Sequence, residues 1–228
     1  MYNWNIFKSF TKGEWGLWIG SLIFIMLSFC FSSEKELLTL IASLIGVTAL
    51  IFVAKGDVIG QVLTCVFSLF YAVISFRFHY YGEMITYLGM TSPIALLSVV
   101  SWLKHPYKKN EVEVASLKKS QFMTLGALTI FVTWTFYFVL KYFETVNLCM
   151  STISIATSFM ASALMFLRSP YYAIAYASND MVLILLWIMA SIENVSYLPM
   201  VLCFVIFLVN DLYGFVNWKR IQKRQHQI

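Results

Sequence analysis

Two Asn-Asp pairs, Asn179-Asp180 and Asn210-Asp211, stand inside long apolar runs of the C-terminal half of the chain. A carboxylate inside a membrane costs at least a few kcal/mol and usually faces a partner or a water-filled cavity. The first pair lies about eight residues into its run and the second about seven residues before the end of its own. A helical rise of about 1.5 Å per residue therefore puts both roughly 10–13 Å below one membrane surface. The matching depth predicts that two adjacent helices present these pairs to one polar cavity.

Further polar and aromatic residues recur at steps of three and four, which places them on single helix faces. The candidate binding residues are Gln61, Thr64, Ser68, Tyr71, Tyr87, Thr91, Tyr176, Asn179, Asp180, Trp187, Asn210, Asp211, Tyr213 and Asn217. Amide side chains can bind a carboxamide or sugar hydroxyls as donor and as acceptor. Aromatic rings attract cations, and an aspartate can offset a fixed positive charge or carry a proton. Such a cavity suits a flat, polar ring compound, whether cationic or neutral.

Other polar and aromatic residues receive a structural interpretation. Serine stripes in membrane helices commonly serve packing, so Ser154, Ser158 and Ser162 are not expected in the site. Tyr172, Trp102 and Trp218 lie near a membrane boundary, where aromatic side chains commonly act as anchors. Asp180 and Asp211 are the ionisable residues expected well inside the spans.

Catalytic and metal-binding chemistry find little support. The four cysteines form no CxxC pair, so we expect buried, unreactive thiols and no metal site. His79 and His105 fall in loops, which disfavours a histidine proton relay. An aspartyl-type intramembrane enzyme is the remaining enzymatic alternative, and it would need Asp180 and Asp211 within about 3 Å. We therefore expect no catalytic residues and no cofactor.

Composition identifies an integral membrane protein. Apolar residues make up 60% of the 228 residues, charged residues make up 12%, and the mean hydropathy is +0.77. A bilayer-spanning helix needs about 20 mostly apolar residues. Eight such runs are present, at about 15–32, 37–54, 57–76, 84–103, 121–143, 147–167, 171–191 and 197–217.

The distribution of positive charge predicts the orientation. With both termini on one side, all sixteen lysines and arginines except Lys35, Arg77 and Lys141 fall on that side. Cytoplasmic loops carry such an excess, so both termini are expected in the cytoplasm. The charge is explained by topology and lipid attraction, with no need for nucleic acid. Residues 1–14 are expected to form an amphipathic surface segment and show no signal-peptide cleavage site.

An internal repeat organises the spans. Residues 41–61 and 153–173 each contain a small-residue helix, a short turn with one cation (Lys55 or Arg168) and the start of another helix. The expected units are two three-helix repeats (37–103 and 147–217), a linker helix (121–143), an additional helix (15–32), a basic loop (104–120) and a basic tail (218–228). Parallel repeats of this kind are a transporter architecture. The fold class is therefore an all-α membrane protein of about eight spans.

The segments "NDLYGFVNWKR", "KGDVIGQ" and "FRFHYYGEM" resemble the PnuC family of bacterial vitamin-precursor transporters, from about Leu37 onward. The resemblance implies a three-plus-one-plus-three architecture similar to SWEET sugar transporters. It supports Asn210, Tyr213, Asn217 and Trp218, together with Gln61. The seventh span departs from the tryptophan-rich motifs of the family, because its one tryptophan is Trp187.

The resemblance also implies import of nicotinamide riboside across the bacterial inner membrane by facilitated diffusion, feeding NAD synthesis. Carriers of thiamine, riboflavin or a sugar with the same fold remain alternatives, and a homo-oligomer is possible. For the mechanism we expect alternating access, with the two repeats rocking around the cavity and Pro93 acting as a flexing point.

Overall fold

The computed structural model describes residues 10–31, 36–108 and 111–227. Within these ranges, eight helical segments are long and apolar enough to cross a membrane. Their bounds are α1 (Lys12–Phe31), α2 (Leu37–Ala54), α3 (Val58–Arg77), the composite α4 (Tyr81–Thr86), η2 (Tyr87–Thr91) and α5 (Ser92–Lys104), α6 (Lys119–Tyr142), α7 (Leu148–Phe166), α8 (Tyr172–Glu193) and α9 (Leu198–His226). The all-helical membrane fold expected from the sequence is confirmed. Residues 1–9, which hold most of the expected amphipathic segment, lie outside the described ranges.

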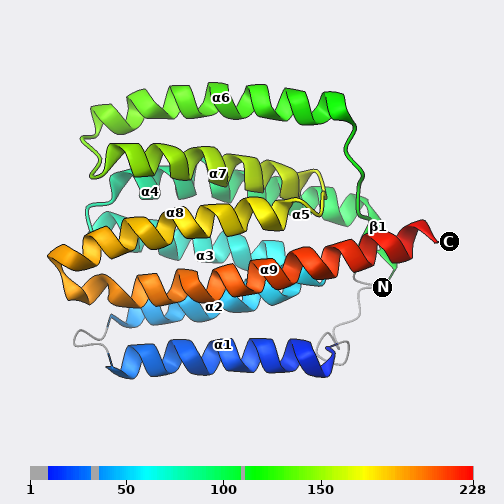
Figure 1. Ribbon diagram of the computed structural model, residues 1–228, viewed down its shortest axis with the longest axis horizontal. Helices are drawn as coiled ribbons and strands as arrows, with labels where there is room; N and C mark the ends of the chain where they lie inside the picture. The colour runs from blue at the N-terminus through cyan, green and yellow to red at the C-terminus, as the bar shows by residue number, and fades with distance from the viewer. Residues whose placement is uncertain (1–9, 32–35, 109–110, 228) are drawn as a thin grey trace.

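Six of the spans form a closed ring. Around the ring, α2 packs on α3, α3 on α5, α5 on α7, α7 on α8, α8 on α9, and α9 on α2 again. The third span of each repeat therefore contacts the first span of the other repeat. Helix α1 flanks α2 and α9, whereas α6 flanks α7 on the other side of the bundle (Figure 1).

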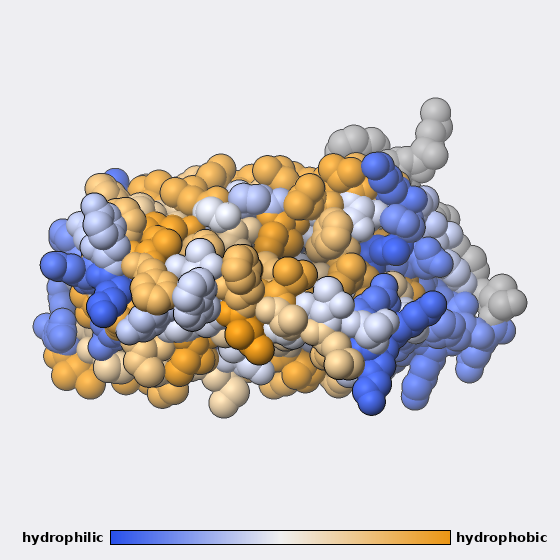
Figure 2. Space-filling view, turned by 90° about the horizontal axis from the view of Figure 1, so that it is seen from above, coloured by the Kyte–Doolittle hydropathy of each residue, from blue (hydrophilic) through white to orange (hydrophobic). Residues whose placement is uncertain are grey.

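The surface of the bundle has the polarity of a membrane protein. Hydrophobic residues cover its middle and hydrophilic residues gather at both ends, most densely at one of them (Figure 2). The outer face of α6 shows the pattern most clearly, because Ile130 is 73% exposed and Trp134 is 62% exposed. In water such a surface would be costly, whereas lipid tails solvate it.

The end that carries most of the charge is called the basic end below. It comprises the turn at 55–57, the turn at 167–171, the loop 105–118 and the last turns of α9. The loop contains a short antiparallel pair of strands, β1 (Pro106–Lys108) and β2 (Glu111–Val112). The segment expected as a basic tail instead continues α9 to His226, and α9 projects past the bundle there (Figure 1).

The two repeats match in their backbone at this end. Residues 52–60 and 164–172 form the same series of hydrogen bonds in one register, from Asp57 to the Phe52 carbonyl and from Ser169 to the Leu164 carbonyl, for example. In this register Gly56 (φ 71°) corresponds to Arg168 (φ 56°). The ranges 41–61 and 153–173 pair in this same register, and the two cations fall one residue apart within it, since Lys55 precedes the position that Arg168 shares with Gly56. A left-handed backbone conformation is what the two turns share.

The fourth span is interrupted at the level of the ring centre. A π-helical turn, Tyr87–Thr91, separates α4 from α5, and Pro93 follows it. Proline has no N–H to donate and its ring crowds the preceding turn. The widened turn relieves this conflict and carries Tyr87 and Thr91 toward the interior of the ring.

Candidate binding cavity

A cavity lies at the centre of the ring, and all six ring spans contribute to its wall. Its lining residues are Gly46, Ala49, Leu50 and Val53 from α2, Thr64 and Phe67 from α3, Tyr87 and Thr91 from the π turn, Ser158 and Met165 from α7, Tyr176, Asn179 and Asp180 from α8, and Phe204, Phe207 and Asp211 from α9. Its volume is about 60 Å³. Pockets for drug-sized ligands measure about 300–1,000 Å³, so the cavity is smaller than such pockets in this structure.

The two aspartates meet in this cavity. Asp180 and Asp211 are 3% and 4% exposed, and their carboxyl groups lie within hydrogen-bond reach of each other. The Oδ2 atom of Asp180 has no hydrogen-bond partner among the described residues. The cavity thus presents an acidic oxygen with free capacity to accept a hydrogen bond or face a cation.

The amide of Asn179 has a fixed orientation. Its Oδ1 accepts hydrogen bonds from Thr157 at 2.8 Å and from Ser158 at 2.9 Å, both on α7, and the Ser154 hydroxyl lies 3.5 Å away. With both lone pairs of the oxygen occupied by hydroxyl groups, the amide offers its N–H donors to the cavity. An N–H donor beside a carboxyl pair can recognise a carbonyl or hydroxyl oxygen of a ligand.

Half of the predicted binding residues line the cavity: Thr64, Tyr87, Thr91, Tyr176, Asn179, Asp180 and Asp211. The others lie outside its wall: Gln61, Ser68, Tyr71, Trp187, Asn210, Tyr213 and Asn217. All of the residues in this second group stay predictions as binding residues. The hydrogen bonds that they form are with neighbouring helices or within their own helix.

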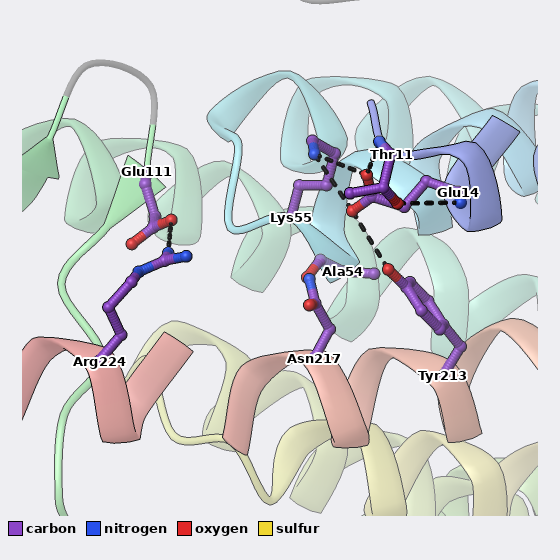
Figure 3. A network of polar contacts seen from close by, with 8 residues as sticks. All are labelled: Thr11, Glu14, Ala54, Lys55, Glu111, Tyr213, Asn217 and Arg224. Carbon is purple, nitrogen blue, oxygen red and sulfur yellow. Dashed lines mark hydrogen bonds and ion pairs between the residues drawn. The ribbon is translucent and has the colours of Figure 1, made fainter. Parts of the chain in front are cut away.

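Three of them connect α9 to its neighbours. Asn210 donates to Ser21 at 3.1 Å, Tyr213 donates to Glu14 at 3.1 Å, and Asn217 donates to the Ala54 carbonyl at 2.8 Å. Figure 3 shows Tyr213 and Asn217 pointing from α9 toward α1 and α2. These contacts fix the position of α9 beside the additional helix.

The remaining four lie on the buried face of α3 or beside it. Ser68 donates to the Thr64 carbonyl of its own helix at 2.6 Å. Trp187 donates to the Tyr71 hydroxyl at 3.0 Å. Gln61 is buried, and its Nε2 has no partner among the described residues.

A buried carboxylate and one side of the cavity were not expected from the sequence. Glu83 is fully buried inside the fourth span and accepts a hydrogen bond from Ser154 at 3.5 Å, so Asp180 and Asp211 are not the only buried acids. The expected span began one residue after Glu83, which hid it. Ser158, interpreted as packing, lines the cavity, and Ser154 links Glu83 to Asn179. The steps of four along α7 were the available signal.

Indole hydrogen bonds between the repeats close the basic end of the cavity. Trp102 donates to the Met165 carbonyl at 3.2 Å, and Trp218 donates to the Val53 carbonyl at 2.8 Å. Their acceptors correspond in the register of the two repeats. Tyr172 packs on Trp218 with ring centroids 4.8 Å apart. The three aromatic residues are buried, so their interpretation as membrane-boundary anchors is wrong.

The loop of the basic end adds a second pair of matching contacts. Val112 donates to the Gly56 carbonyl at 3.0 Å, and Ala115 donates to the Arg168 carbonyl at 2.9 Å. The loop therefore binds the corresponding turn of each repeat. Burial lowers the pKa of the Arg168 guanidinium, while the Glu113 carboxylate, 3.6 Å away, opposes that shift.

The last turns of α9 hold the same loop. Gln225 accepts from the Val114 N–H at 2.8 Å and donates to Glu111 at 3.0 Å, and Arg224 pairs with Glu111 (Figure 3). Close by, Glu14 pairs with Lys55 at 3.0 Å and ties α1 to the first turn. Loop, turns and helix ends thus form one connected layer.

An aromatic cluster closes the opposite end. Trp187 packs against three aromatic rings. The distances between ring centroids are 4.9 Å to Tyr80, 5.9 Å to Phe78 and 6.0 Å to Tyr197. The ring centroids of Tyr71 and Tyr87 lie 4.2 Å apart, so Tyr71 connects this cluster to the cavity wall. The cavity therefore lies between two aromatic closures.

Comparison with known proteins places the chain in a family. The family model described as "Nicotinamide mononucleotide transporter" matches residues 36–220. The chain belongs to this family. The match begins just before α2 and ends within α9, so it spans both repeats and leaves α1 outside.

Curated relatives agree with the family assignment. A protein of Neisseria mucosa named "Nicotinamide riboside transporter PnuC" is 26% identical over 86% of this chain and 76% of its own length. A protein of the same name from Haemophilus influenzae is 21% identical over 91% of this chain and 90% of its own. The resemblance to PnuC expected from the sequence is confirmed.

A solved structure shares the fold. The "Crystal structure of the Vitamin B3 transporter PnuC" superimposes with a TM-score of 0.84, covers 95% of this chain and 94% of that chain, and is 24% identical in sequence. The coverage includes the additional helix α1 as well as both repeats. The arrangement of one plus three plus one plus three spans is thus shared with a transporter of the family.

Proposed function

We propose that the protein carries nicotinamide riboside across the bacterial inner membrane by facilitated diffusion, feeding NAD synthesis, and that it performs no enzymatic step. The observation that carries the proposal is the central cavity between two repeats, lined by an aspartate pair, an oriented asparagine and aromatic side chains. The choice of nicotinamide riboside as the transported compound follows the names of the two curated relatives.

The chemistry of the cavity matches that compound. Nicotinamide riboside has a permanently cationic ring, a carboxamide and a ribose. The Asp180–Asp211 pair supplies negative charge for the ring, and the N–H donors of Asn179 suit the carboxamide oxygen or a ribose hydroxyl. Tyr87, Tyr176 and the phenylalanines of α9 offer faces on which a cationic ring can lie.

The transport cycle is proposed as alternating access. The basic end, where α1 begins and α9 ends, faces the cytoplasm, as the positive charge predicts. The substrate enters through the aromatic cluster around Trp187, the cavity widens to hold it, and separation of the repeats at Trp102 and Trp218 releases it. Nothing in this cycle uses an ion gradient.

Uptake into proteoliposomes tests the proposal. Vesicles holding the purified protein should equilibrate labelled nicotinamide riboside with no sodium or proton gradient, and excess unlabelled compound should compete where thiamine and riboflavin do not. Accumulation above the external concentration driven by a pH step would overturn facilitated diffusion. Uptake of thiamine or riboflavin instead would overturn the assigned substrate.

A further inference from the structure

The carboxyl pair of the cavity cannot hold two full negative charges easily. Asp180 and Asp211 face each other from α8 and α9 within hydrogen-bond reach, and both are buried. Two ionised carboxylates at such a separation repel, and the low dielectric of a buried site strengthens the repulsion. One proton between the two groups removes the repulsion and supplies the hydrogen bond that joins them.

Among the residues that the structure describes, none brings a positive charge to the pair. The titratable groups that face it are phenols and a thiol: Tyr87 from the π turn, Tyr172 and Tyr176 from α8, and Cys203 from α9. The cavity residues of α2, α3 and α7 are uncharged. In the described ranges, no lysine, arginine or histidine forms an ion pair with either aspartate. A charge on the pair is therefore left for a ligand to offset.

We infer that Asp180 and Asp211 share one proton and act as a single negative charge that selects singly charged cationic rings. The unpartnered Oδ2 of Asp180 is the oxygen that meets the ring. A neutral ring would leave the charge buried and uncompensated, which is costly. A doubly charged ligand would exceed the charge of the pair. The inference rests on the proposed function for the identity of the cation.

If the two aspartates share one proton, either of them can be replaced by asparagine without loss of the negative charge of the pair. In Asp180→Asn or Asp211→Asn, the new amide can donate a hydrogen bond to the remaining carboxylate, as the shared proton did. The net charge of the pair stays at one. In the double variant the amides are neutral and the charge is lost. Two independently ionised aspartates would behave differently, since each single variant would then lose half of the charge.

Two measurements on the same purified variants test the inference. Infrared spectroscopy of the ligand-free protein at neutral pH detects the C=O stretching band of a protonated carboxyl group. Calorimetry measures the binding of nicotinamide riboside. The variants are Asp180→Asn, Asp211→Asn, the double variant and Glu83→Gln. The last is the matched control, because Glu83 is another buried acid and lies outside the cavity wall.

The expected infrared result is a carboxyl band that persists in Glu83→Gln and weakens in each single aspartate variant, where any contribution of Glu83 remains. The double variant should bind at least about tenfold more weakly than wild type, since a hydrogen bond to a charged group is lost, and each single variant, which keeps one negative charge, should bind more tightly than the double variant. Absence of the band from wild type, or single variants as weak as the double variant, would overturn the inference. A band in a wild-type protein that does not bind the compound would uphold the shared proton and reject the proposed substrate.

Discussion

The two ends of the cavity are closed by different contacts. At the basic end, Trp102 and Trp218 donate hydrogen bonds to corresponding backbone carbonyls of the other repeat, and the loop 105–118 binds both turns. At the opposite end, ring packing around Trp187 dominates, with the hydrogen bond from Trp187 to Tyr71. Backbone acceptors hold one closure in register, whereas the other depends on side chains that can rotate.

This difference assigns separate roles to the two ends. Side-chain packing can yield by rotamer changes, so the opposite end can admit a ligand without movement of whole repeats. Opening the basic end requires the repeats to separate together, because each indole bond joins one repeat to the other. We therefore expect the resting protein to open first at the opposite end.

The largest expected contrast comes from two buried glycines. A Cβ at Gly60, beside the basic end, would stand 2.5 Å from the Val53 backbone nitrogen, which cannot move alone. A Cβ at Gly82, at the opposite end, would meet side-chain atoms of Thr145 and Leu140 at 2.7 and 2.8 Å. Overpacking costs typically about 1–3 kcal/mol, and we expect Gly60→Ala to reach or exceed that range and Gly82→Ala to fall below it.

Thermal unfolding in detergent, followed by intrinsic fluorescence, checks this contrast. Gly126→Ala is the control, since its Cβ would meet nothing within 4 Å. Its Tm should match that of wild type. A larger loss of Tm in Gly82→Ala than in Gly60→Ala would reverse the assignment of the rigid end.

Loss of the indole donors should give the next largest effect. Trp102→Phe combined with Trp218→Phe keeps both rings buried and removes both hydrogen bonds, each contributing about 0.5–1.5 kcal/mol. The fraction of protein molecules whose basic end is open should then rise about tenfold. Trp187→Phe is the matched change at the opposite end and should leave the basic end unaffected.

A cavity cysteine reports the opening. Thr64→Cys in a background without the four native cysteines would be labelled by a membrane-impermeant maleimide from each side of oriented vesicles. The double tryptophan variant should be labelled faster from the basic end. If this variant and its parent were labelled equally fast from that side, the indole hydrogen bonds would not be what keeps the basic end closed.

The loop should make the smallest contribution. Gln225→Ala deletes contacts with Glu111, Val112 and Val114 on the loop, and local opening should rise by about two- to tenfold. Limited trypsin digestion at the loop lysines measures this opening. Gln227→Ala, an exposed change two residues farther along, is the control. Unchanged digestion in Gln225→Ala would show that the rest of α9 holds the loop without it.

The sequence predicted those features that repeat along one helix or one turn. The spans, the repeat, and the placement of Tyr87 and Thr91 on an interior face follow from local patterns, and the meeting of Asp180 with Asp211 follows from their equal depth in two spans. The partner of an interior residue is set by packing between helices, which periodicity does not contain. Asn179 and Asn210 each directly precede an aspartate, yet one lines the cavity and the other contacts α1.

The most direct test of the account is calorimetry of nicotinamide riboside binding to two matched variants. Asn179→Leu removes an amide from the cavity wall, and Asn217→Leu removes the same group from a contact with α2. If the central cavity is the binding site, Asn179→Leu should weaken binding at least about tenfold, because a buried donor to the ligand is lost. Asn217→Leu should stay within about threefold of wild type. Loss of binding in Asn217→Leu with unchanged binding in Asn179→Leu, in proteins of equal Tm, would contradict the account.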